Sequence, residues 1–177
     1  VMDEFLNYSV KMAEAVSKLD IGFFLLDDDI ADSHGTILSH KLLEELWIPR
    51  TEIMLKPIKR RNIPILYHCC GKLDDVIPMA IEMGIEAIHP IQPFCNDIYA
   101  IKRKYGDEIC LIGNMDIAGP LAFGTPQEVV KDTREHIEKL APGGGYIAGS
   151  SHSITDNIPP ENFAAMIKTI QTFGLYK

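Results

Sequence analysis

Residues 65–93, "ILYHCCGKLDDVIPMAIEMGIEAIHPIQP", contain the pattern that decides the fold. An apolar run of strand type at 63–69 is followed by a stretch of helical period at 73–83 and by a second strand-type run at 86–91. A strand, a helix and another strand in this order are typical of parallel strands joined by a helical crossover. The segment therefore predicts a parallel sheet with its helices outside.

The same alternation continues on both sides of this segment. Further strands are expected at 21–27, 108–113 and 145–150, and helices at 2–19, 40–60, 96–105, 126–140 and 160–173. Thr125 is the expected N-cap of the helix that starts at Pro126, with Glu128 completing a capping box. Pro49 and Pro57 leave open whether 40–60 is one helix. This pattern predicts one α/β domain over 1–177, either an open doubly wound sheet or a (β/α) barrel.

Composition restricts the kind of partner. The 177 residues are 46% apolar and carry a net charge of −8, with only 17 lysines and arginines. Nucleic acids and anionic membranes select basic surfaces, so a small molecule or another protein is the expected partner. The first twenty residues lack the pattern of a signal peptide, and the run "IGFFLL" is too short to span a bilayer. We therefore expect a cytoplasmic protein with reduced cysteines.

Polar groups that core packing does not require follow each expected strand. They are Asp27-Asp28-Asp29, His68-Cys69-Cys70, His89 with Gln92, Asn114 with Asp116, and Ser151-His152. In barrels the active site lies at the carboxyl ends of the strands, so these five groups are expected to converge on one face.

The pair His68 and Cys70 predicts a metal site. The two side chains leave the same side of an extended strand, whereas Cys69 points the other way, into packing. His152, at the end of the last strand, is the expected third ligand, because three protein ligands with an open fourth position are the pattern of catalytic zinc. A purely structural role for a histidine and a cysteine at a strand end remains the alternative.

The remaining polar residues are assigned by position. Asp28 and Asp29 are expected to be catalytic, or else to form a solvated or helix-capping acidic run. A substrate pocket lined by His89, Gln92, Asn114 and Asp116 is expected, the alternative being that these are satisfied strand ends. The other histidines, His34, His40 and His136, are expected at the surface.

Taken together, several stretches resemble the C-terminal half of the uroporphyrinogen decarboxylase superfamily, which also contains corrinoid-dependent methyltransferases. They are "LDDDIADSHGTILS", residues 65–93, "KRKYGDEICLIGNMD", "LAFGTPQEVVKDTREHIEKLAPGGGYIAGSSHSI" and "DNIPPENFAAM". The resemblance implies a TIM-type (β/α)8 barrel, of which this chain supplies about five C-terminal βα units while the N-terminal part of the barrel is missing.

The resemblance also implies a zinc motif. The methyltransferases carry H-x-C and a distant cysteine near the last strand, so His68 and Cys70 match the first two positions and His152 stands in place of the cysteine. The decarboxylases also carry a histidine near that point, but they depend on an arginine-rich segment that these residues do not contain. One thiolate with two neutral imidazoles leaves positive charge on zinc, which suits polarisation of an ether oxygen.

We therefore expect a zinc-dependent methyltransferase that moves a methyl group from a small methylated substrate, such as a methyl ether, to a corrinoid protein. The corrinoid is expected on a separate protein, because the sequence contains no D-x-H-x-x-G motif. Five units cannot close an eight-stranded barrel. The sequence is therefore expected to be either a fragment of a longer protein or a short form completed as a homodimer or by another chain. A decarboxylase-like lyase and a truncated non-catalytic assembly subunit are the alternatives.

Overall fold

The computed structural model describes residues 1–176 and contains a parallel sheet of five strands in the order β1-β2-β3-β4-β5. The strands are β1 (Phe24–Asp27), β2 (Ile65–His68), β3 (Ala87–His89), β4 (Cys110–Met115) and β5 (Tyr146–Ser150). Each strand pairs in parallel with the next strand of the chain, as helical crossovers require. The expected α/β fold with parallel strands is confirmed.

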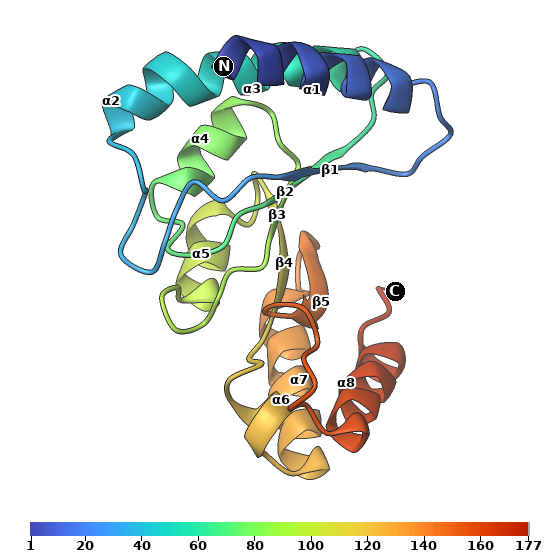
Figure 1. Cartoon of the computed structure of the whole chain (residues 1–177). Helices are drawn as coiled ribbons and strands as arrows, with labels where there is room; N and C mark the ends of the chain where they lie inside the picture. The colour runs from blue at the N-terminus through green and yellow to red at the C-terminus, as the bar shows by residue number, and fades with distance from the viewer. Residues whose placement is uncertain (177) are drawn as a thin grey trace.

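The helices cover the outside of this sheet and join its strands (Figure 1). They are α1 (Met2–Val16), α2 (His40–Leu42), α3 (Ile48–Lys59), α4 (Val76–Glu82), α5 (Ile98–Tyr105), α6 (Pro120–Phe123), α7 (Pro126–Leu140) and α8 (Pro160–Phe173). Figure 1 shows α1 lying along α3 at one end of the molecule, and α7 beside α8 at the other. No helix within residues 1–176 is both long and apolar enough to cross a membrane.

The helical region at 40–59 is continuous but not uniform. A π-helical turn, η1 (Leu43–Trp47), lies between α2 and α3. Pro49 occupies the first turn of α3, where its missing N–H is tolerated, and Pro57 lies inside the helix near its end. The two prolines therefore neither split the region nor end it early.

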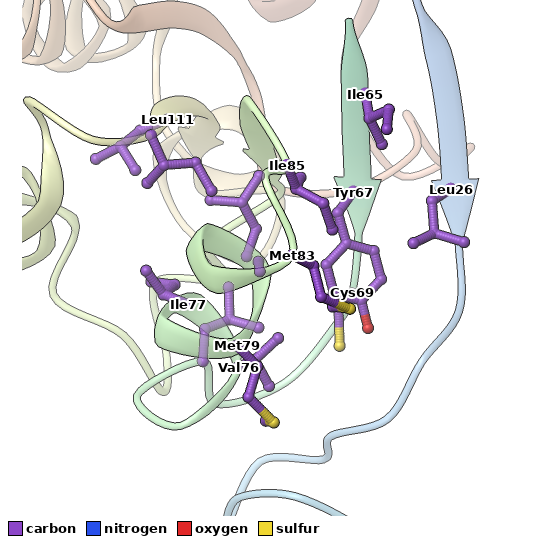
Figure 2. Packing of buried hydrophobic residues seen from close by; sticks show 14 of the residues in the cluster. Leu26, Ile65, Tyr67, Cys69, Val76, Ile77, Met79, Met83, Ile85 and Leu111 are labelled. Carbon is purple, nitrogen blue, oxygen red and sulfur yellow. The ribbon is translucent and has the colours of Figure 1, made fainter. Parts of the chain in front are cut away.

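The core lies between the sheet and the helices. Tyr67 and Cys69 have no exposed surface, and they belong to the buried cluster drawn in Figure 2, which also contains Leu26 and, from α4, Val76 and Met79. Side chains alternate along a strand, so the residues between these core positions point to the opposite face of the sheet. Cys69 is therefore a packing residue, as the sequence predicts.

That opposite face is the inner wall of a partial barrel. Leu25 on β1 is 49% exposed and Ile147 on β5 is 51% exposed, although their chain neighbours Leu26 and Tyr146 are buried in the core. In the order of the sheet, β1 and β5 each pair with one other strand. The five strands thus form an arc with two free edges, and the carboxyl ends of the strands carry the expected polar groups.

Candidate metal centre

His68 and Cys70 lie at the carboxyl end of β2 and face each other. Nε2 of His68 is 3.5 Å from Sγ of Cys70. Zinc binds nitrogen at about 2.0–2.1 Å and thiolate sulfur at about 2.3 Å, so tetrahedral geometry separates two such ligand atoms by about 3.6 Å. The spacing of this pair therefore fits a shared zinc ion.

Asp29 is the third member of the group. A ligand atom from each of Asp29, His68 and Cys70 lies within 4.8 Å of the others. Oδ1 of Asp29 also accepts a hydrogen bond of 2.7 Å from the backbone N–H of Cys70. Carboxylate, imidazole and thiolate are all zinc ligands, and three of them leave a fourth position for substrate.

His152 lies on the loop after β5, outside this group of three, and is exposed. It is close enough to His89 for its charge to lower the pKa of that residue. The structure therefore brings together two of the three expected ligands, His68 and Cys70, and adds Asp29 to them.

Metal-free Cys70 is a protonated thiol. Burial, followed by the negative charge of Asp29, raises the pKa of Cys70 to about 11. A thiolate is the form that binds metal, so an ion that binds here must displace the thiol proton.

The loop that carries Cys70 is held by side chains from the segment after β3. Oε1 of Gln92 accepts from the backbone N–H of Gly71 at 2.7 Å, and Oδ1 of Asn96 accepts from that of Leu73 at 2.9 Å. Nδ2 of Asn96 also donates to the Gly71 carbonyl at 2.8 Å. Gln92 therefore positions this loop, and Asn96 does the same although it belongs to no sequence motif.

Gly71 permits a close approach of two loops. Its φ of +88° is unfavourable for other residues, and a Cβ there would lie 2.5 Å from the carbonyl oxygen of Asp32. The loop after β2 is thereby packed against the loop after β1, which carries Asp29.

Asp28 is anchored rather than free. Its Oδ2 accepts from Nε1 of Trp47 at 2.6 Å, and its backbone carbonyl accepts from the Tyr67 hydroxyl at 2.8 Å. These bonds hold the loop after β1, so that Asp29 is directed at Cys70.

Asn114 and Asp116 are engaged in contacts of their own. The Asn114 amide is buried, with Nδ2 donating to the Ile91 carbonyl at 2.6 Å and Oδ1 3.1 Å from Nε2 of His136. Asp116 closes a local turn by accepting from the backbone N–H of Ala118 at 2.9 Å.

The expected surface position of His136 is wrong, because this residue is only 9% exposed. His136 links α7 to the end of β4.

His89 contacts His68 directly. The two Nδ1 atoms are 2.8 Å apart, and the residues are register partners in β2 and β3. Burial, followed by the neighbouring His68, lowers the pKa of His89 to about 4. His89 is therefore neutral at pH 7.

The family model described as uroporphyrinogen decarboxylase (URO-D) matches residues 1–173. The chain belongs to the uroporphyrinogen decarboxylase family. The partial barrel is the arrangement expected of a piece of that fold.

Relatives in this family have two kinds of name. A uroporphyrinogen decarboxylase from Methylococcus capsulatus is 27% identical over 129 residues, covering 72% of this chain and 35% of the relative. A methylated-thiol–coenzyme M methyltransferase from Methanosarcina mazei is 23% identical over 172 residues, covering 93% of this chain and 42% of the relative. Both relatives are named as enzymes, and the chain spans less than half of either.

A solved structure confirms the fold. A methyltransferase from Methanosarcina mazei superposes with a TM-score of 0.73 at 18% sequence identity, over 96% of this chain and 48% of the other. At this identity the match establishes the partial (β/α) barrel and nothing about chemistry.

Proposed function

We propose that this chain contains the zinc site of a methyltransferase that moves a methyl group from a small methylated substrate to a corrinoid protein. The observation that carries the proposal is the grouping of Asp29, His68 and Cys70 at the ends of β1 and β2. The similarity to the methylated-thiol–coenzyme M methyltransferase supports it. The corrinoid and its separate carrier follow from the resemblance to the corrinoid-dependent methyltransferases.

The proposed ligands differ in charge from the set expected from the sequence. Asp29 and the Cys70 thiolate are negative and His68 is neutral, so together they balance the two charges of a zinc ion. Zinc held there would supply a Lewis acid to the substrate's sulfur or oxygen. The preference for a methyl ether rests on His152 as a neutral ligand; with Asp29 in its place, methylated thiols and methyl ethers are both compatible substrates.

Asp28 and Asp29 have different roles in this proposal. Asp29 is a metal ligand, and its second contact with the Cys70 backbone keeps the two ligands together. Asp28 positions the loop through Trp47 and Tyr67. His152 is exposed and lies outside the ligand group, so the proposal gives it a role toward the substrate rather than the ion.

A decarboxylase-like lyase is the second candidate, favoured by the identity to the uroporphyrinogen decarboxylase of Methylococcus capsulatus. This second function assigns no metal to the chain. Metal content therefore separates the two candidates.

The experiment is zinc analysis of the purified protein beside Cys70→Ser. The wild type is expected to bind about one zinc per chain, and Cys70→Ser to lose it, because serine is not ionised at neutral pH. Cys110→Ser, at a half-buried cysteine on β4, is the matched control and should keep the metal. Zinc that is absent from the wild type, or unchanged in Cys70→Ser, would reject the proposed metal site.

A further inference from the structure

We propose that His89 is a positioning residue that sets the tautomer of His68, so that Nε2 of His68 is free to bind the metal. The inference rests on the proposed zinc site and goes beyond it, because it concerns a residue that does not touch the ion. This positioning role replaces the role in substrate binding that the sequence predicts for His89.

The sheet itself brings the two rings together. His68 and His89 end neighbouring parallel strands in register, and their ring centroids are 4.9 Å apart with a tilt of 39°. The separation of 2.8 Å between the two Nδ1 atoms is that of a hydrogen bond. Both rings are partly buried, so water competes weakly for this bond.

A hydrogen bond between two imidazole nitrogens contains one hydrogen. Nε2 of His68 faces Sγ of Cys70 at 3.5 Å and must carry no proton when it binds a metal. Neutral His68 then carries its proton on Nδ1 and donates it to Nδ1 of His89. His89 is required to be the acceptor.

Neutral His89 can be this acceptor. With its proton on Nε2, it presents a bare Nδ1 to Nδ1 of His68, 2.8 Å away, and accepts the hydrogen bond.

This arrangement also argues against His89 as a ligand. Its Nδ1 meets the nitrogen of His68 that points away from Cys70. Metal-bound histidines generally donate their second N–H to a partner that orients the ring, and loss of that partner costs about 10–100-fold in metal affinity.

Two measurements test the inference. Nitrogen-15 NMR of the metal-free wild type should show His68 with its proton on Nδ1, and His89→Leu should move His68 to the Nε2–H form. Zinc affinity, measured by competition with a chromophoric chelator, should fall about 10–100-fold in His89→Leu. His89→Gln keeps a side-chain oxygen that can accept from His68, so it should restore most of the affinity.

The absorption spectrum of the cobalt-substituted protein separates positioning from ligation. The cobalt spectrum of His89→Gln should match that of the wild type, whereas loss of a ligand would change it. An Nε2–H tautomer of His68 in the wild type overturns the inference without any variant. If Cys70→Ser loses zinc but the zinc affinity of His89→Leu is unchanged, or folded His89→Gln does not recover it, the inference about His89 is wrong and the zinc site stands. A wild type that binds no zinc overturns both this inference and the proposed function.

Discussion

The choice of the third zinc ligand depends on one residue, Asp29 or His152. The substitution Asp29→Asn keeps an oxygen that can accept from the Cys70 backbone but removes the charge and the strong ligand. We expect this substitution to weaken zinc binding at least about tenfold, whereas His152→Ala should leave it within about twofold. Chelator competition on both variants measures this, and the reverse pattern would restore His152 as the ligand.

Zinc affinity should also depend on pH through Cys70. The pKa of this thiol is raised to about 11, so it is protonated at neutral pH and binding must release its proton. Below that pKa, each unit of rising pH increases the thiolate fraction about tenfold, so zinc should bind about tenfold more tightly per unit between about pH 7.5 and 9. Calorimetry in buffers of different ionisation enthalpy should detect about one proton released; no release and a flat pH profile would show that Cys70 is not a ligand.

The sequence predicts some of these residues better than others. The different roles of Cys69 and Cys70 can be predicted, because successive side chains of a strand point to opposite faces and this depends only on the backbone period. The role of Asp29 depends on Asp28 being held by Trp47, a contact between residues 19 positions apart that no local pattern encodes. The surface position expected for His136 is wrong for a similar reason: its partner, Asn114, lies on another element 22 residues away.

Among the elements, α7 has the start most clearly encoded in the sequence. The Thr125 side chain accepts from the Glu128 backbone at 3.3 Å, and the Glu128 carboxylate accepts from the Thr125 backbone at 2.7 Å. Thr125→Ala should lower the free energy of unfolding by about 1 kcal/mol, measured by urea denaturation. Thr125→Ser keeps the cap and is the control; an equal loss in both variants would mean that the cap contributes nothing.

The pH dependence of this cap has a definite sign. Hydrogen bonds from Thr125 lower the pKa of Glu128 in the folded state. The resulting stabilisation is present above the unfolded pKa and is lost as the pH falls through the folded one. The difference between wild type and Thr125→Ala should therefore shrink in acid.

Other elements are harder to predict for physical reasons. The parallel strands follow from apolar runs, but their bounds differ from those expected: β1, β2, β3 and β5 are shorter, and β4 has the expected length but begins two residues later. The π-helical turn Leu43–Trp47 has no sequence signal, although it ends at the tryptophan that anchors Asp28. The short α6 is not expected from the sequence because four residues are too few to show a helical period.

At the scale of the whole molecule, five βα units make an arc that places its site at one rim. The sequence predicts this arrangement because parallel strands must all direct their carboxyl ends the same way. It cannot predict what covers the inner face, since that depends on residues or chains beyond the arc. The family match and the TM-score of 0.73 to a longer methyltransferase chain agree with a partial barrel.

A polypeptide of these 177 residues by itself should associate with itself in solution through its inner face. Leu25 and Ile147 lie on the two edge strands, about half exposed at 49% and 51%, and free edges of a parallel sheet are open to pairing. We expect a dimer or larger species by light scattering coupled to size-exclusion chromatography, and a shift toward monomer in the double variant Leu25→Lys with Ile147→Lys. Val130→Lys changes a residue of similar size, 38% exposed on the outer helix α7, and should leave the association unchanged. A lysine opposes association only where it lies in the contact surface. A monomeric wild type, or equal dissociation by Val130→Lys, would therefore show that the inner face is not that surface.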